Sequence, residues 1–189
     1  GCMKRPALLI IDMQNDFVRS GAPLQVVQAP AVIPKIRAVL DAFRNRKLPV
    51  FHVLRVHRAD GSDVEITRQD LFRKAPFAVA GTGGAAVVDE LSPLPGEYVI
   101  EKTRMSAFIG TELDLVLRTL GVTDLVVTGI QTPNCVRTTV FDAIAYNYPV
   151  ILVRDAVGAK DDAVHAANVA DMGNIGVRIM TAQDLIAVL

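Results

Sequence analysis

The sequence is poor in residues that mark several common classes of protein. It has no tryptophan, only three histidines and only two cysteines among 189 residues. Two cysteines are too few for a disulfide framework or a clustered-cysteine zinc site. One of them, Cys2, precedes Met3 in a Gly-Cys pair that we interpret as an expression remnant. Cys135 is then the only native thiol, and a lone thiol is usually a small buried hydrophobe.

The sequence also lacks an excess of either charge and any long apolar run. Its 20 basic side chains equal its 20 acidic ones, which does not indicate an electrostatic nucleic-acid binder. No apolar run approaches the roughly 20 residues that a membrane-spanning helix needs. The run at 8–11 ends at Asp12 and lacks the flanks of a signal peptide. We therefore expect a cytoplasmic protein that binds neither nucleic acid nor membrane.

Short aliphatic runs alternate with helix-like segments along the whole chain. Strands are expected over residues 7–11, 50–54, 98–100, 125–130, 150–153 and 177–180. The alternation predicts an α/β fold, in which helices cover both faces of a doubly wound, mostly parallel sheet. The length suits one three-layer αβα domain over residues 1–189.

Helices are expected between these strands, over residues 34–47, 112–120, 133–146 and 162–172, and after Thr181. Pro34 suits the first turn of its helix, Thr111 can cap the next helix, and Gly121 can end it. Residues 57–95 are rich in Gly, Asp and Pro and show no clear element. So long an irregular stretch is unusual in a compact domain, and we expect a functional role as a lid or subunit contact.

Three chemically different side chains stand at the ends of expected strands. Asp12 ends the first strand, Lys102 ends the third, and Cys135 follows the fourth. Taken singly, Asp12 is equally well interpreted as the cap of a local turn, and the patterns around Lys102 and Cys135 favour a solvated lysine and a buried inert thiol. Ligands of doubly wound sheets bind beyond the carboxyl ends of the strands, near the point where strand order reverses. The conjunction of the three groups at that edge predicts a functional site.

The segment around Cys135 has the pattern of a helix start. Thr132 is a good N-cap and Pro133 suits the first helical position, which places Cys135 in the first turn. Backbone amides there lack intrahelical partners and could hold an oxyanion. The helix dipole and Lys102 would favour the thiolate. Asp12 could serve as the general base that takes the thiol proton and returns it to a leaving group.

Three sequence blocks resemble the signature blocks of the isochorismatase-like cysteine hydrolases. They are Asp-Met-Gln-Asn-Asp-Phe at 12–17, Glu-Lys-Thr-Arg-Met-Ser-Ala-Phe at 101–108 and Gly-Ile-Gln-Thr-Pro-Asn-Cys-Val at 129–136. Thr138-Thr139, Asp142-Ala143 and Asp155-Ala156 also fit. The resemblance covers nearly the whole chain, with the blocks in order.

The resemblance implies a catalytic triad of Asp12, Lys102 and Cys135. It also implies a cis peptide between Ile130 and Gln131, with an oxyanion hole formed by the amides of Gln131 and Cys135. The implied activity is hydrolysis of a C–N bond in a small amide, ureide or carbamoyl-type substrate through an acyl-enzyme. No cofactor is implied. Compact members commonly form dimers or tetramers, so we expect a homo-oligomer.

Two other functions remain open at this point. Family members that hydrolyse the vinyl ether of isochorismate lack the cysteine nucleophile, so Cys135 argues against that activity. Family resemblance fixes a fold better than an activity, so a non-enzymatic scaffold or binding protein is the second alternative.

Arg55 distinguishes the chain from the metal-binding members of the family. Nicotinamidases of the family bind a metal through Asp and His residues in this region, and Arg55 stands where their first Asp would be. A guanidinium has no lone pair to donate, and no histidine cluster follows His57, so no metal site is expected. Arg55, Phe17 and Phe108 are candidate substrate contacts, although a structural salt bridge is an equally open interpretation of Arg55.

One further motif is a weak match to a nucleotide site. Gly81-Thr82-Gly83-Gly84-Ala85-Ala86 fits the Gly-x-Gly-x-x-Ala pattern, and Glu101 follows about 20 residues on. No convincing strand precedes the glycines, and they lie in mid-chain. We therefore interpret this stretch as a flexible active-site loop.

Overall fold

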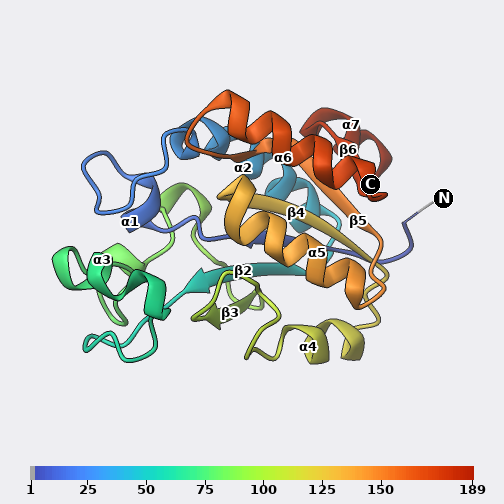
Figure 1. The fold of residues 1–189 in the computed structure, drawn as a ribbon. Coiled ribbons are helices and arrows are strands. Elements are labelled where there is room, and N and C mark those ends of the chain that lie inside the picture. Colours follow the sequence, from blue (N-terminus) through green and yellow to red (C-terminus); the bar gives the residue numbers. More distant parts are fainter. Residues whose placement is uncertain (1–2) are drawn as a thin grey trace.

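Six strands form a parallel sheet in the computed structural model, which describes residues 3–189 (Figure 1). The strands are Pro6–Ile11 (β1), Val50–Arg55 (β2), Tyr98–Lys102 (β3), Asp124–Ile130 (β4), Val150–Gly158 (β5) and Arg178–Met180 (β6). Their order is β3-β2-β1-β4-β5-β6, and every pair is parallel. The direction of winding reverses between β1 and β4, which confirms the predicted doubly wound α/β fold. The interpretation of Cys2 lies outside the described residues.

Helices cover both faces of the sheet. They are Asn15–Val18 (α1), Ala29–Asn45 (α2), Gln69–Lys74 (α3), Leu113–Thr119 (α4), Arg137–Ala145 (α5), Asp162–Asn174 (α6) and Ala182–Val188 (α7). Helices α2 and α7 pack on one face, whereas α4, α5 and α6 pack on the other (Figure 1). None of the helices described over residues 3–189 is both long and apolar enough to cross a bilayer.

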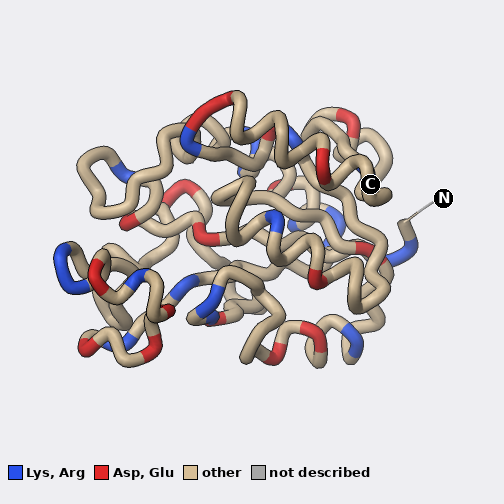
Figure 2. Tube along the Cα trace, in the orientation of Figure 1, with Lys and Arg blue, Asp and Glu red and all other residues tan. Residues whose placement is uncertain are grey.

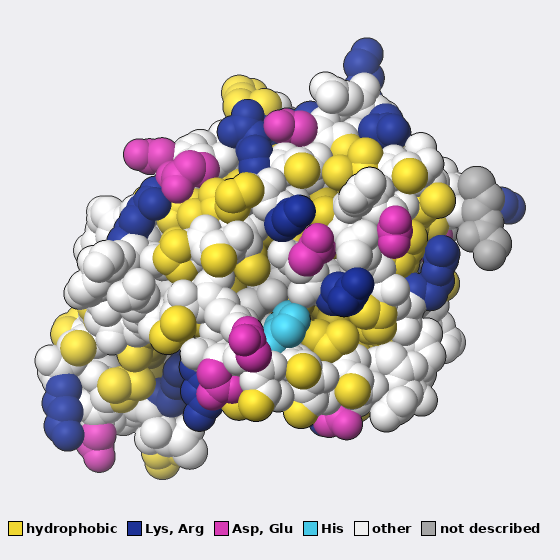
Figure 3. Space-filling model, turned by 90° about the horizontal axis from the view of Figure 1, so that it is seen from above, with side chains coloured by type: hydrophobic (Ala, Val, Ile, Leu, Met, Phe, Trp, Pro, Cys, Tyr) yellow, Lys and Arg dark blue, Asp and Glu magenta, His cyan; other side chains and the backbone are white. Residues whose placement is uncertain are grey.

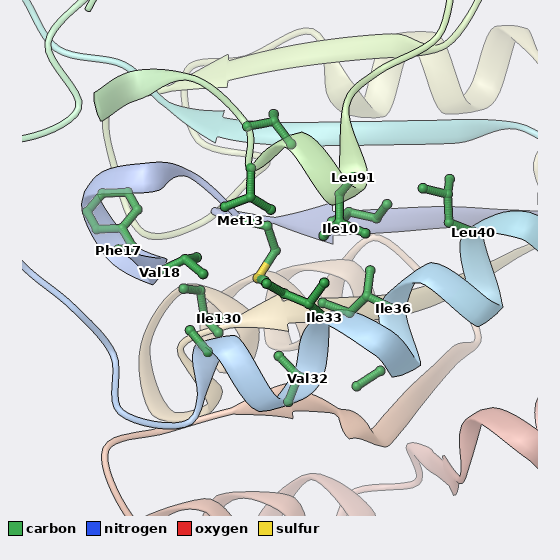
Figure 4. Close-up of a cluster of buried hydrophobic side chains, with 14 of the residues drawn as sticks. Ile10, Met13, Phe17, Val18, Val32, Ile33, Ile36, Leu40, Leu91 and Ile130 are labelled. Carbon is green, nitrogen blue, oxygen red and sulfur yellow. The ribbon is translucent and has the colours of Figure 1, made fainter. Parts of the chain in front are cut away.

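Successive side chains of the central strand β1 point to opposite faces of the sheet, and every residue of the strand is buried. Leu8 and Ile10 join the cluster under α2, and Leu9 joins the cluster under α4 and α5. Figure 4 shows Ile10 and Met13 facing the buried side of α2. The sheet is thereby held between two apolar layers, and polar side chains that end its strands are left at its carboxyl edge.

Two elements differ from the sequence prediction. Helix α2 begins at Ala29, so Pro34 lies inside the helix and the first-turn assignment is wrong. Pro34 cannot donate to the carbonyl of Pro30, but Pro30 is exposed, so water can satisfy that carbonyl. Strand β5 continues beyond the apolar run to Gly158, because its end pairs again with Ile130 of β4 after a register shift.

Residues 57–95 contain more structure than their composition predicts. Three 3-10 turns and α3 lie in this stretch, at Ile66–Arg68, Gly83–Ala85, Asp89–Leu91 and Gln69–Lys74. The Asn15 side chain donates to the Gly83 carbonyl at 2.7 Å, and an added Cβ on Gly84 would lie 2.3 Å from the Asp16 carboxylate. The glycine-rich segment is thus packed against α1. The expectation of a flexible active-site loop there is wrong.

Glu97 connects β2, α2 and the turn before β3 at the amino end of the edge strand β3. Its carboxylate accepts two hydrogen bonds from Arg44 at 2.7 and 2.8 Å, one from the Leu94 amide at 2.8 Å and one from His52 at 2.9 Å. Burial would raise the pKa of Glu97, but these hydrogen bonds outweigh it and lower the pKa from 4.5 to about 2.

We predict that Glu97→Gln destabilises the fold in a pH-dependent way. A carboxyl whose folded pKa is depressed stabilises the protein above its unfolded pKa, and that contribution is lost as pH falls through the folded pKa. Near neutral pH, the free energy of unfolding of the wild type should exceed that of the variant by up to about 3 kcal/mol. The gap should close between pH 4.5 and about 2, as measured by urea unfolding.

The matched control is Glu90→Gln, which removes an exposed carboxylate paired with Arg19. An exposed ion pair contributes roughly 0–1 kcal/mol, so this variant should change little. A stability gap for Glu97→Gln that does not vary with pH would contradict the assignment.

Candidate active site

Lys102 contacts the other two side chains, Asp12 and Cys135, that the sequence predicts at the edge of the sheet. Its Nζ lies 3.2 Å from Oδ2 of Asp12, 3.3 Å from Sγ of Cys135 and 2.9 Å from the Arg104 carbonyl oxygen. All three side chains are buried. The fold therefore brings a carboxylate, an ammonium and a thiol from β1, β3 and the end of β4 into direct contact.

Asp12 owes its position to a sharp turn at the end of β1. Its φ is +56°, in the left-handed region that Asp adopts more readily than most residues. The Asp12 amide still donates to Val53 of β2 at 2.9 Å, while its carbonyl accepts from Gln14 at 2.8 Å. The chain thus leaves the sheet at Asp12, with the carboxylate at the carboxyl edge.

Strand β4 passes unusually close to β1 just before the cysteine segment. A Cβ added at Gly129 would lie 2.2 Å from the Ile11 carbonyl oxygen, and Gly129 has a φ of +111°. Only glycine fits both conditions. The peptide bond between Ile130 and Gln131 is cis, at the position where the family resemblance places one.

Cys135 does not lie in the first turn of a regular helix. Residues Thr132–Val136 form a π turn, in which the Val136 amide donates to the Gln131 carbonyl at 3.2 Å, and α5 begins after it. Gln131 takes the N-cap position, and the buried Thr132 hydroxyl instead lies 2.9 Å from Nδ1 of His165 on α6. The prediction that Thr132 caps the helix is therefore wrong, because its hydroxyl contacts His165 and not a backbone amide of its own helix.

The environment of Cys135 favours the protonated thiol in the resting site. Burial raises the pKa of Cys135, and the Asp12 carboxylate raises it further, while Lys102 and Arg55 oppose the rise without cancelling it. This differs from the expectation that the helix dipole and Lys102 favour the thiolate. Oδ1 of Asp12 is buried and accepts no hydrogen bond from residues 3–189. The site thus offers a buried carboxylate oxygen that is free to accept a proton.

The buried Arg55 forms a second ion pair beside the thiol, with the half-buried Glu65. Nη1 donates to Glu65 at 2.8 Å and to the Thr103 carbonyl at 3.2 Å, and Nη2 lies 3.8 Å from Sγ of Cys135. The buried side-chain amide of Gln14 accepts a hydrogen bond from the backbone N–H of Arg55 at 2.9 Å. It also donates one to the backbone carbonyl of Arg55 at 2.7 Å. The salt-bridge interpretation of Arg55 is confirmed, and the same side chain faces the site.

The residues around Arg55 do not fit a divalent cation. Nη1 of Arg55 lies 3.4 Å from Nε2 of His57, and Nδ1 of His57 pairs with Asp63 at 3.0 Å. A guanidinium repels a cation and offers no lone pair, and the imidazole is already engaged at both nitrogens. Within residues 3–189, no three His, Cys, Asp or Glu side chains form a group able to hold a metal.

A cavity of about 410 Å³ opens onto the three side chains. Its lining is Asp12, Phe17, Ala22, Pro23, Leu24, Gln25, Val26, Arg55, Arg68, Met105, Ile130, Gln131, Asn134, Cys135 and Lys160. Phe17 lies where a substrate contact was expected. Phe108 does not, since its ring packs against Tyr146 and Tyr148 at centroid distances of 5.2 and 6.2 Å.

Several functional positions escaped the sequence analysis. Gln14 lies within the first signature block, two residues after Asp12. Its position in that block is the feature of the sequence that could have identified it. Glu65, Arg68 and Lys160 stand in segments without a local pattern, and only folding brings them to the cavity or to Arg55.

The fold and the site together define a doubly wound αβα protein with a buried cysteine, carboxylate and lysine at its switch point. The Isochorismatase domain model matches residues 6–184, so the chain belongs to the isochorismatase family. The family resemblance read from the three blocks is thereby confirmed.

Individual proteins agree with this assignment. An Arabidopsis thaliana protein named "probable inactive nicotinamidase" is 44% identical, over 96% of this chain and 94% of that one. N-carbamoylsarcosine amidase from an Arthrobacter species is 34% identical, over 92% of this chain and 67% of that one. A crystal structure of an isochorismatase family protein from Desulfovibrio vulgaris superposes with a TM-score of 0.94 at 46% identity and 96% coverage of both chains.

We predict that iodoacetamide alkylates Cys135 with a rate that rises at high pH. In a Cys2→Ser background, the apparent thiol pKa should lie above the ordinary 9.0, because burial and Asp12 disfavour the thiolate. Asp12→Asn should lower this apparent pKa by removing the negative charge, and Lys102→Met should raise it. Mass spectrometry of the alkylated peptide over a pH series measures each profile.

Asp41→Asn on α2 is the control, because Asp41 pairs with Arg37 on the surface. Its profile should match that of the parent. A profile centred below the ordinary thiol pKa, or an upward shift in Asp12→Asn, would show that the electrostatics of the site differ from those described.

Proposed function

We propose that the protein hydrolyses a C–N bond in a small amide, ureide or carbamoyl-type substrate through an acyl-enzyme on Cys135. The observation that carries this proposal is the position of Lys102, whose Nζ contacts both Asp12 and Cys135 in a buried site open to a cavity. Nucleophilic catalysis by cysteine needs a base within reach and a third group that orients the pair. These residues supply both.

Asp12 takes the proton from Cys135 as sulfur attacks the substrate carbonyl carbon. The π bond of the carbonyl becomes an oxyanion, which accepts hydrogen bonds from the amides of Gln131 and Cys135. When the oxyanion collapses, the C–N bond breaks and the leaving amine takes the proton from Asp12. Water then attacks the thioester, Asp12 accepts a proton from that water, and the Cys135 thiol is restored as the acid leaves.

The two neighbouring cations assist different stages of this cycle. Lys102 holds Asp12 in place and offsets the charge that moves between the carboxylate and sulfur. Arg55, with Nη2 3.8 Å from Sγ, offsets the negative charge of the thiolate. Burial raises the pKa of the Cys135 thiol, so a base is needed to take its proton, and Asp12 supplies that base.

The vinyl-ether alternative is disfavoured by the presence of the thiol at the centre of the site. The alternative of a non-enzymatic scaffold is raised by one relative, which is named a probable inactive nicotinamidase. In this chain Arg55 and its partner Glu65 occupy the part of the site where a metal would lie, which disfavours a metal-dependent activity. They leave Asp12, Lys102 and Cys135 in contact, which supports catalysis on a different amide.

Cys135→Ala is predicted to abolish turnover while the fold survives. A panel of small amides, ureides and carbamates with ammonia detection first identifies a substrate. The alanine variant should then lose about a thousandfold or more in kcat, while its stability changes by about 1 kcal/mol. Cys135→Ser should bind substrate and retain very little rate.

Cys2→Ser is the thiol control and should keep full activity. Mass spectrometry of quenched wild type should detect a covalent adduct on Cys135 that the alanine variant lacks. If the alanine variant keeps more than a few per cent of activity, the covalent mechanism is wrong.

Turnover is predicted to be independent of divalent metal. Arg55 places a fixed positive charge beside His57, so a metal ion would meet repulsion and no vacant ligand set. Exhaustive dialysis against EDTA should leave kcat unchanged on the substrate found in the panel. Loss of activity that zinc or manganese restores would show that the residues around Arg55 rearrange to bind a cation.

A further inference from the structure

The charge around Cys135 comes from a few buried side chains. Figure 2 shows acidic and basic residues interspersed along the trace, and Figure 3 shows the same mixture among apolar side chains on the face seen from above. Exposed charges of both signs are screened by salt. Asp12, Lys102 and Arg55 are at most 5% exposed, and their charges act directly on the thiol. The reactivity of Cys135 therefore depends on how each of these three is held.

Arg55 uses its two terminal nitrogens differently. Nη1 faces three acceptors, which are Oε1 of Glu65 at 2.8 Å, the Thr103 carbonyl oxygen at 3.2 Å and Nε2 of His57 at 3.4 Å. Nη2, in contrast, has one hydrogen-bonding contact within residues 3–189, which is Sγ of Cys135 at 3.8 Å. The protein thus anchors the guanidinium through one nitrogen and turns the other toward the thiol.

His57 is held so that it accepts a hydrogen bond from Arg55. Its Nδ1 lies 3.0 Å from the Asp63 carboxylate, which can only accept, so Nδ1 carries the ring proton and Nε2 carries the lone pair. Phe72 and Phe77 contact the ring edge to face, at centroid distances of 6.0 and 5.6 Å. Burial lowers the pKa of His57 more than Asp63 raises it, so the anchoring imidazole is neutral at neutral pH.

Glu65 is the closest of the three anchors and the one that carries a charge. Its side chain is 16% exposed. Burial raises the pKa of Glu65, but the hydrogen bond from Arg55 outweighs burial and the pKa lies below its ordinary 4.5. An unanchored arginine samples many rotamers, and this one would be free to turn into the cavity that it lines. The contact with Glu65 keeps the guanidinium beside the sulfur.

We infer that Glu65 and His57 are positioning residues for the reaction at Cys135, since they hold Nη1 of Arg55 so that Nη2 faces the sulfur. Neither residue lines the cavity, so both act through Arg55. The inference rests on the proposed function for its effect on turnover, whereas its effect on the thiol is measurable in the resting protein.

A positioning role and a purely electrostatic role of Glu65 predict opposite effects on the thiol. A carboxylate that acts only through its charge disfavours the thiolate, so its removal would lower the pKa of Cys135. A carboxylate that holds Arg55 beside the sulfur has the reverse effect, because its loss lets the cation move away. Glu65→Gln and Glu65→Leu remove the same charge, but only glutamine keeps an oxygen that can accept from Nη1. Their difference isolates the positioning role.

The test measures alkylation of Cys135 by iodoacetamide over a pH series in a Cys2→Ser background. The apparent pKa of Cys135 should be about one unit higher in Glu65→Leu than in Glu65→Gln. His57→Leu should exceed His57→Gln in the same direction, by less, because a neutral acceptor binds a guanidinium more weakly than a carboxylate does. In an Arg55→Met background both differences should disappear, because the two residues act through Arg55.

Turnover supplies a second measurement. On a substrate found in the amide panel, Glu65→Leu should have a kcat about tenfold below that of Glu65→Gln, as expected for a shift of one pKa unit. The two KM values should agree within about twofold, because residue 65 does not line the cavity.

Asp70→Asn and Asp70→Leu are the matched control pair, because Asp70 lies in α3 of the same stretch and pairs with Arg73 on the surface. Both should give the parent profile, and circular dichroism checks that every variant is folded. Equal pKa values in Glu65→Gln and Glu65→Leu, or a difference that persists without Arg55, would overturn the inference. If Glu65→Leu alone fails to fold, the two His57 variants decide by the same comparison. Unfolding of both Glu65→Leu and His57→Leu would assign these residues to stability and would also overturn it.

Failure of this inference is distinguishable from failure of the proposed function. Turnover with equal alkylation profiles would leave the hydrolase standing without the positioning role. The expected difference in alkylation, with no turnover and no adduct on Cys135, would leave the positioning of Arg55 standing without the hydrolase.

Discussion

The site depends on a buried ion pair between Asp12 and Lys102, whose strands β1 and β3 are separated by β2 in the sheet. Removing two charges from water costs several kcal/mol per ion, so the pair persists only with further polar partners. The Arg104 carbonyl and the Cys135 sulfur supply them to Lys102. The ion pair thereby connects the edge strand β3 to the end of the central strand β1, next to the Cys135 thiol. Loss of either partner would leave an uncompensated charge in the core.

A second ion pair, between the buried Arg55 and the half-buried Glu65, lies in the segment after β2. Its guanidinium is fixed by Glu65 on one side and by the Thr103 carbonyl on the other, while Gln14 clamps its backbone. This network links the stretch after β2 to the signature segment that contains Asp12. It also changes the character of the site, because a permanent cation stands close to His57 and Cys135. The stretch over residues 57–95 therefore contributes to the electrostatics of the site, since Glu65 pairs with Arg55 and Arg68 lines the cavity.

Close backbone packing sets the remaining geometry. Gly129 allows β4 to approach β1 at a distance that no side chain would permit, and the π turn that follows carries Cys135 toward Lys102. The turn is anchored outside the site by the contact between Thr132 and His165 of α6. The position of the nucleophile is thus determined by packing between β1, β4 and α6, and not by a capping motif within its own helix.

Local pattern was enough to predict the sheet, the alternation of helices and the convergence of Asp12, Lys102 and Cys135 at one edge. These features follow from apolar runs and from the geometry of parallel strands, both of which are written in neighbouring residues. Tertiary structure decided the rest. It gave Thr132 a distant partner, raised the pKa of Cys135 by burial, placed Phe108 away from the cavity, and brought Arg68 and Lys160 to one lining. Desolvation and long-range contacts of this kind depend on residues far apart in the chain, so no local pattern records them.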